Sequence, residues 1–319
     1  MIFMNFNKIF FLLFISLYMC KTNTHAQTKH EIGLINDNDL YVSFYLDEYY
    51  TNGLELFYKQ ATSTNYDFFN KKIRQFTIGQ NIYNPQDSDV TKVTFQERPY
   101  AGYLYANYSE HLINTKSILT LGATVGVTNT KSGAEWAQNF IHTFYDIDPS
   151  NGWDTQIKEK YAIGVLANYT RSILYKENFP LSLSWINTAK LNNVFTNISS
   201  GIAIRFNFLK TVLAPISNST FFGTALQYGD EKWIKESYFG IKSFATYQIK
   251  DITITGELEK NPTQKEFHIE PWTWQNDFGF YWNSKHTNFS YHIIYCTKNV
   301  QEMRTKITRY GSIQFSYKF

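Results

Sequence analysis

The feature that most constrains the fold is an alternation of apolar and polar residues along nearly the whole chain. In segment 53–58, Leu54, Leu56 and Tyr58 share one face. A period of two places alternate side chains on opposite sides of a β-strand. We expect a dozen strands or slightly more in one domain, because no repeat or linker interrupts the pattern. The strand-like segments are 31–35, 40–46, 53–58, 72–81, 101–112, 117–127, 160–174, 181–185, 200–208, 220–227, 238–249, 251–260, 274–282, 288–296 and 307–319.

Composition narrows the class of β-protein. Aromatic residues make up 18% of the chain, and the mean hydropathy is −0.35. After the first residues, no apolar run is long enough for a membrane-spanning helix. Strands with an apolar lipid face, a polar lumenal face and aromatic girdles are typical of outer-membrane barrels. The chain also ends on an alternating strand that finishes with Phe319. A soluble β-sandwich can end in the same way, but the full pattern predicts an all-β transmembrane antiparallel barrel of about 12 strands.

The N-terminus predicts export. Lys8 precedes the apolar run 9–19, and Ala26 ends a stretch with the small residues that a signal peptidase reads. We expect a signal peptide at residues 1–26 and a barrel domain at residues 27–319. Cys20 lies in an outline of a lipoprotein box, but methionine fits poorly before it. Cleavage after Ala26 leaves only Cys296, so no internal disulfide is expected.

One segment departs from the strand pattern. From Ser132 to Phe144 the spacing becomes helical, with Ser132 or Gly133 as a candidate N-cap and Glu135 in the first turn. On such a helix Glu135, Gln138 and His142 would share one face, and Trp136, Phe140 and Phe144 another. We place this helix in an extracellular loop, because long loops of such barrels lie outside the cell.

Several polar groups are candidates for chemistry, although each has an ordinary structural interpretation. A lone histidine such as His142 is more often structural than catalytic, although its usual pKa suits a general base. The cluster Asn36-Asp37-Asn38-Asp39 offers the oxygen ligands that calcium prefers, but the same residues dominate turns. No Gly-x-Ser-x-Gly elbow is present in the sequence to suggest a serine hydrolase.

Taken in order, six motifs are more specific than any one alone. They are Asn-Asp at 36–37, Tyr-Thr-x-Gly at 50–53, Gly-Gln-x-x-Tyr-x-Pro at 79–85, Arg-Pro-Tyr-Ala-Gly at 98–102, Gln-x-x-x-His at 138–142 and Gly-Trp-Asp-x-Gln at 152–156. This series resembles the outer-membrane lipid A 3'-O-deacylase family. The resemblance implies a twelve-stranded barrel with a helix-bearing outer loop. It also implies calcium-dependent hydrolysis that removes the 3'-linked acyloxyacyl group of lipid A.

The resemblance also implies roles for individual residues. His142 matches the general base that activates water, and Gln138 matches a polar residue lining the site. Asn36 matches the oxyanion side of the Asn-Asp motif, and Thr51 matches the hydroxyl of the Tyr-Thr motif. General-base catalysis and oxyanion stabilisation each contribute roughly 10²–10³-fold or more, so both sides of the site are expected to matter.

The metal side is implied in the same manner. Asp37 and Asp148 are the expected Ca²⁺ ligands, although Asp148 stands where relatives carry a longer glutamate. The family's site lysine has no secure counterpart, and Lys92 is the nearest. Asn84 replaces the threonine that is common before the proline of its motif. A calcium ion would act as a Lewis acid toward the carbonyl oxygen.

Two other interpretations stay open at this stage. The barrel could be a pore or a structural protein without activity, or an esterase of the same mechanism acting on another lipid such as a phospholipid. The formal net charge of +3 is too small to suggest a nucleic-acid partner. The expected partners are lipopolysaccharide and the outer membrane. A monomer is the working expectation for the oligomeric state.

Overall fold

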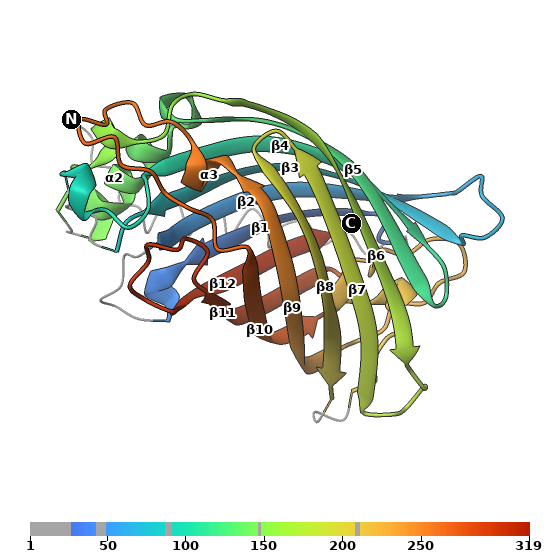
Figure 1. Ribbon diagram of the computed structural model, residues 1–319. Helices are drawn as coiled ribbons and strands as arrows, with labels where there is room; N and C mark the ends of the chain where they lie inside the picture. The colour runs from blue at the N-terminus through green and yellow to red at the C-terminus, as the bar shows by residue number, and fades with distance from the viewer. Residues whose placement is uncertain (1–26, 43–48, 87–90, 146–147, 208–210) are drawn as a thin grey trace, which may run out of the picture.

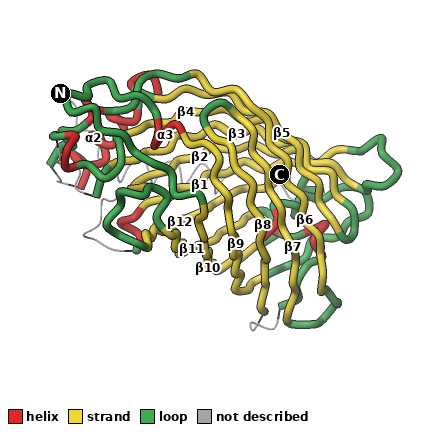
Figure 2. Tube along the Cα trace, in the orientation of Figure 1, coloured by secondary structure: helices red, strands yellow, loops and turns green. Residues whose placement is uncertain are grey.

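The computed structural model describes residues 27–42, 49–86, 91–145, 148–207 and 211–319, so the expected signal peptide lies outside the described residues. Twelve antiparallel strands form a closed barrel (Figures 1 and 2). Their bounds are β1 His30–Asn38, β2 Tyr49–Thr62, β3 Lys71–Asn84, β4 Ala101–Ile113, β5 Ser117–Thr128, β6 Tyr161–Leu174, β7 Leu181–Asn192, β8 Phe195–Phe206, β9 Ser237–Asp251, β10 Trp272–Asn283, β11 Thr287–Thr297 and β12 Ile307–Lys318.

Closure joins the first and last strands. On β1, Glu31 is opposite Lys59 of β2 and also opposite Lys318 of β12. Every other strand pairs with its neighbours in sequence, which abolishes free sheet edges. The predicted all-β barrel of about 12 strands is therefore confirmed, and each of the twelve strands overlaps a segment predicted from alternation.

Two predicted strands are wrong, and a third is wrong in the part that the structure describes. Residues 39–41 form a 3-10 helix, η1 (Asp39–Tyr41), where the segment 40–46 was expected to begin a strand, and residues 43–46 lie outside the described part. Segment 220–227 begins with the 3-10 helix η6 (Thr220–Phe222). Segment 251–260 contains the short helix α3 (Ile252–Thr255). Short alternation can arise in an irregular segment that packs one side against the barrel, so it does not identify a strand by itself.

The two faces of the wall differ in polarity. On β1, Ile32 and Leu34 are exposed on the outer face, whereas Glu31 on the inner face accepts hydrogen bonds from Asn288 and Ser316. The register places outer-face residues of neighbouring strands directly opposite one another. One such row is wholly apolar and consists of Leu34, Leu56, Ile78 and Ala106. This row belongs to the lipid-facing belt.

Connection lengths assign the two ends of the barrel. The start of β1 and the end of β12 meet at one end of the barrel, where the backbones of His30 and Phe319 exchange two hydrogen bonds of 2.9 Å. Short turns at 114–116 and 284–286 lie at the same end, which identifies it as periplasmic. The long connection 129–160 lies at the extracellular end and carries the helix α2 (Ala134–Tyr145), opposite the C-terminus in Figure 1. No helix in the described part of the chain could cross a membrane.

The β8–β9 connection folds into the barrel, which the strand alternation did not predict. Its described residues 211–236 fill the periplasmic part of the lumen, and we call them the plug. Lys71 of β3 donates to the carbonyls of Thr224 and Leu226 and pairs with Glu231 at 2.7 Å. Buried Ile216 and Leu226 pack on the isoleucines of the inner wall, Ile73 among them.

A buried ion pair fixes the end of the plug. Glu236 lies 3.3 Å from Arg205 of β8, and both side chains are at most 2% exposed. Burial raises the pKa of Glu236, and Arg205 together with backbone donors opposes the shift. Because an unpaired buried charge is costly, this pair ties the plug to the wall.

Candidate active site

Helix α2 begins as the sequence predicts. Gly133 adopts the left-handed conformation with φ of 69°, and the backbone N–H of Ala134 donates to Ser132 Oγ at 3.3 Å. Glu135 lies in the first turn. The helix is thus set at its N-terminus by a glycine that can turn the chain and a serine that accepts a hydrogen bond.

The helix is sharply two-sided. Gln138 and His142 are each only 3% exposed, one turn apart. Trp136 and Phe140 are 72% and 52% exposed, and their rings stack at 5.5 Å. Glu135 lies at the edge of the buried face and is exposed, so it does not join Gln138 and His142 as expected. The side chain of Phe144 lies outside the described part.

The buried face of α2 packs on the outer wall of the barrel. Gly102 of β4 alternates with the lumenal Tyr103 and therefore faces outward. A Cβ atom on Gly102 would lie under 3.0 Å from both Ser132 and Ala134, so the helix start touches the strand backbone. Gln80 of β3 donates to the carbonyl of Ser132 at 2.6 Å, and Ile82 packs in one cluster with Ala134. The helix therefore lies against the membrane-facing side of β3 and β4.

Two of the sequence motifs hold this arrangement together. Tyr100 of the Arg-Pro-Tyr-Ala-Gly motif is fully buried and packs on Trp153 at 5.2 Å. A side chain on Gly152 would clash with the Tyr100 ring, which explains a glycine before Trp153. Trp153 Nε1 in turn donates to Gln138 Oε1 at 2.8 Å. These motifs position the helix and orient the amide of Gln138.

Trp153 satisfies only the oxygen of the Gln138 amide. Gln138 Nε2 is buried and has no hydrogen-bond partner among the described residues, and the same is true of Thr51 Oγ1. Thr51 is the extra residue of a β-bulge, where β2 shifts register between Tyr50 and Asn52. The bulge lies beside Ile82, which packs on α2. Buried polar atoms without partners are uncommon and mark a place for a ligand or water.

His142 is oriented by a backbone carbonyl. Its Nδ1 lies 2.7 Å from the carbonyl oxygen of Asp148. A carbonyl can only accept, so Nδ1 carries the proton in this contact and Nε2 is the basic nitrogen of the neutral ring.

Next to the helix, the outer wall carries amides where lipid-facing residues would be expected. The strand register places Asn36, Leu54 and Gln80 in one row, immediately above the apolar row that contains Leu34. The next row contains Asn38, Asn52, Ile82 and Gly102. We call Asn36, Asn38, Asn52 and Gln80 the polar shelf. The polar shelf thus lies between the wall residues that contact α2 and the lipid-facing belt.

Comparison with known proteins shows the family of this chain and its fold. A family model described as "Outer membrane protein LpxR" matches residues 9–319. The chain belongs to the LpxR family. The structure of LpxR from Salmonella typhimurium has the same fold, with a TM-score of 0.71 at 17% identity over 91% of this chain and 100% of that chain.

Other solved barrels align more loosely. The β-domain of the Bordetella autotransporter BrkA gives a TM-score of 0.44 at 8% identity, over 92% of this chain and 100% of that chain. The KdgM porin gives 0.37 at 9% identity, over 91% and 99%. No curated protein sequence matches. The family resemblance inferred from the motifs is confirmed, and so is the outer-membrane barrel.

The expected calcium ligands of this LpxR-family chain do not converge. Asn36 faces outward, where its amide donates to the carbonyl of Gly53 at 3.0 Å and accepts from Tyr41. Asp37 faces the lumen and accepts from Tyr50 at 2.8 Å. The carboxylate of Asp148 is exposed. Calcium needs several oxygen ligands around one point, and no such group of three or more His, Cys, Asp or Glu occurs among the described residues. The side chains of Asp37 and Asp148 do not fit one calcium ion in this geometry.

The neighbouring motif residues lie elsewhere. Lys92 precedes the 3-10 helix η2 (Val93–Phe95) and is exposed. Asn84 is buried and donates to the carbonyl of Pro85 at 2.9 Å. Arg98 is buried over the ring of Tyr83, 4.5 Å from its centroid. Burial lowers the pKa of Arg98, and Asp251 opposes the shift. Arg98 thus links the β3–β4 loop to the end of β9.

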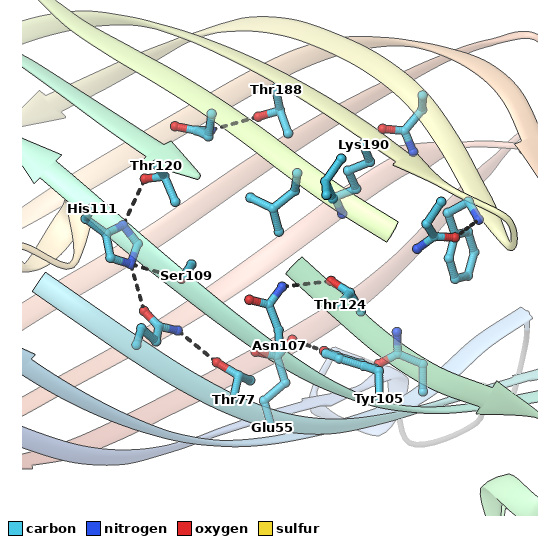
Figure 3. A pocket seen from close by; sticks show the side chains of 18 of the residues that line it. Glu55, Thr77, Tyr105, Asn107, Ser109, His111, Thr120, Thr124, Thr188 and Lys190 are labelled. Carbon is cyan, nitrogen blue, oxygen red and sulfur yellow. Dashed lines mark hydrogen bonds between the residues drawn. The ribbon is translucent and has the colours of Figure 1, made fainter. Parts of the chain in front are cut away.

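The lumen contains polar cavities, but neither Gln138 nor His142 lines them. The cavity in Figure 3 has a volume of about 540 Å³ and is lined by Glu55, Tyr105, His111 and Lys190 among others. Sequence reasoning also missed a second hydrogen-bonded histidine in the lumen. His292 bonds Asp277 at 2.8 Å and Ser290 at 2.9 Å, the order of a catalytic triad. The cavity beside Ser290 is only about 20 Å³, too small for an ester substrate.

Proposed function

We propose that this LpxR-family protein is an ester hydrolase of the outer membrane that removes the 3'-O-linked acyloxyacyl group of lipid A. The observation that carries the proposal is the position of Gln138 and His142. Both lie on the wall-facing side of a helix that packs beside a polar shelf on the membrane-facing wall. A lumenal site would instead serve a solute that passes through the barrel.

The polarity of the outer wall matches an amphiphilic substrate. The shelf of amides lies directly above the apolar row of Leu34, Leu56 and Ile78. An ester of a membrane lipid lies at the boundary between its polar head and its acyl chains, so this boundary on the protein would bring the ester to the level of the shelf. Lipid A resides in the outer leaflet and can reach the wall laterally.

The chemistry assigned to His142 is general-base catalysis. With Nδ1 donating to the carbonyl of Asp148, Nε2 takes a proton from water as the water oxygen attacks the ester carbonyl carbon. The resulting oxyanion collapses, the bond to the 3'-oxygen breaks, and the imidazolium returns the proton to that leaving oxygen. The products are the free acyloxyacyl acid and a 3'-hydroxyl group.

The unpartnered buried atoms are the candidates for stabilising the oxyanion and positioning the ester. Gln138 Nε2 can donate two hydrogen bonds while Trp153 holds its oxygen. Thr51 can donate one more from the bulge of β2. Asn36 is a further candidate in the row of the shelf next to the apolar row, although its amide already donates to Gly53. Loss of one such donor typically costs about 10²–10³-fold in rate. Calcium dependence remains a prediction from the resemblance, and this mechanism routes no step through a metal.

The plug argues against the alternative interpretation of the barrel as a pore. Residues 211–236 fill the periplasmic part of the lumen and are tied to the wall by buried charges, which does not favour a permanently open channel. A phospholipid esterase would use the same residues, so only the products distinguish the two substrates.

The decisive experiment is mass spectrometry of lipid A and phospholipids from cells that express the protein or its His142→Ala form. We expect lipid A to lose the mass of an acyloxyacyl group only when His142 is intact. His268→Ala is a matched control, because His268 is exposed in an extracellular loop and bonds Glu302. Lysophospholipid without a change in lipid A would establish the second esterase, and unchanged lipids with all variants would refute hydrolysis.

A further inference from the structure

The exposed aromatic pair on α2 faces away from the wall, at the extracellular end of the membrane-facing surface. Trp136 and Phe140 are four residues apart and stack with an interplanar angle of 17°. On α2 they lie opposite Ala134 and Gln138, which contact the wall or its loops. Large aromatic side chains exposed to this extent are unusual in water and usually mark an interaction surface.

Aromatic side chains mark the membrane boundary elsewhere on this barrel. At the extracellular end of β9 and β10, Tyr247 and Trp272 face outward and pack at 5.0 Å. Tyr161 is 62% exposed at the extracellular start of β6. Such residues form the girdle at the level of the lipid head groups.

The girdle is interrupted where α2 packs. The outward positions in the extracellular part of β2 to β5 carry no aromatic residue. They are Asn52, Leu54, Gln80, Ile82, Gly102, Leu104, Val125 and Val127. The aromatic residues of this sector are on the helix that covers the wall. The surface of α2 is therefore continuous with the lipid-facing belt, with Leu104 and Val127 directly opposite each other beside it.

We propose that Trp136 and Phe140 insert into the outer leaflet at the boundary between head groups and acyl chains, so that α2 is an interfacial membrane anchor. The occupant of this surface is the lipid of the surrounding membrane. An amphipathic helix with its aromatic face in lipid and its polar residues on the other side is a recognised mode of interfacial binding. The anchor also fixes the height of His142 relative to the leaflet.

The inference rests on the outer-membrane location of the barrel and is independent of the proposed hydrolysis. It can therefore be tested in the His142→Ala form, where a failure of hydrolysis changes nothing. A lipid contact at these positions, with no deacylation by the protein that retains His142, would retain the anchor and reject the function. Deacylation by that protein without a lipid contact would do the opposite.

The test is spin-label accessibility in the refolded barrel, reconstituted in vesicles that contain lipopolysaccharide. Labels are placed singly through Trp136→Cys and Phe140→Cys in a Cys296→Ser background. Ile78→Cys in the apolar row supplies the lipid reference, and Lys92→Cys supplies the aqueous reference. Glu135→Cys is the control on the same helix, because position 135 is exposed but lies at the edge of the buried face, outside the aromatic face. Heat-modifiable migration verifies that each variant is folded.

We expect the ratio of oxygen to water-soluble nickel accessibility at positions 136 and 140 to be closer to that at 78 than to that at 92. Position 135 should be closer to 92. Accessibility at 136 and 140 equal to that at 92 would overturn the anchor. Dipolar broadening between labels at 136 on separate molecules would also overturn it, because the pair would then contact a second copy.

Discussion

The start of α2 lies tightly against the barrel wall at Gly102, and this contact makes a demanding test of the proposed site. Gly102→Ala adds one methyl group on the outer face of β4. That Cβ would lie under 3.0 Å from the side chains of Ser132 and Ala134, whereas ordinary contact begins near 3.4 Å. The backbone φ of Gly102 is not positive, so alanine is unstrained in the strand itself. The helix must therefore move away from the wall.

The size of the effect follows from the geometry. Overpacking of this kind costs about 1–3 kcal/mol. Strand pairing of β4 with β3 and β5 does not depend on the helix, so we expect the barrel to remain folded. A retreat of the helix start by even several tenths of an ångström displaces Gln138, and a misplacement of about 1 Å can cost about 10²-fold in rate. Deacylation is thus expected to fall by roughly 10–10²-fold.

The assay is the initial rate of deacylation of purified lipid A, measured by mass spectrometry, with heat-modifiable migration as the test of folding. Gly79→Ala is the matched control. Its Cβ would also lie under 3.0 Å from a neighbour, but that neighbour is the lumenal ring of Tyr105. Full activity in Gly102→Ala, or an equal loss in Gly79→Ala, would refute the idea that contact between α2 and the outer wall sets the active geometry.

The remaining predictions concern the base, the metal and the plug. His142→Gln should be as inactive as His142→Ala, since it restores a hydrogen bond but no base, whereas Gln138→Ala should lose only about 10–10³-fold in deacylation rate. Chelation of calcium should abolish deacylation and added Ca²⁺ should restore it. Because Asp37 faces the lumen, Asp37→Ala should leave that calcium titration unchanged, and a shifted titration would show that Asp37 is a ligand after all. Glu236→Gln leaves Arg205 buried without its charge partner, at a cost of about 3–5 kcal/mol. It should lower the unfolding temperature and raise single-channel conductance, and a closed barrel with unchanged stability would contradict the role given to the plug.

Much of the barrel was predictable because strand alternation is a local property. Segment 53–58 reads as a strand in the sequence and is one in the structure, and the same holds for the terminal strand ending near Phe319. The helix was equally visible, since glycine, serine and glutamate at its start act within one turn. The alternation also implied that the side chains of Asn36 and Asp37, as neighbours on one strand, point to opposite faces of the wall. Continuing the outward series of Ile32 and Leu34 to Asn36 would have shown which of the two faces the lipid.

What only the tertiary structure decided depends on contacts between distant residues. Segment 220–227 alternates like a strand in the sequence but belongs to the plug in the structure. The plug is held by contacts such as the pair of Glu236 with Arg205, and these residues meet only when the barrel has closed. Similarly, the sequence predicts Gly102 within a strand, and it gives no reason for a glycine at 102 or at 152. Their role is to admit a helix and a tyrosine ring that the register of β3 and β4 brings against them. Alternation along a strand is determined by its own backbone, whereas the contents of the lumen and the covering of the outer wall are determined by packing across the barrel.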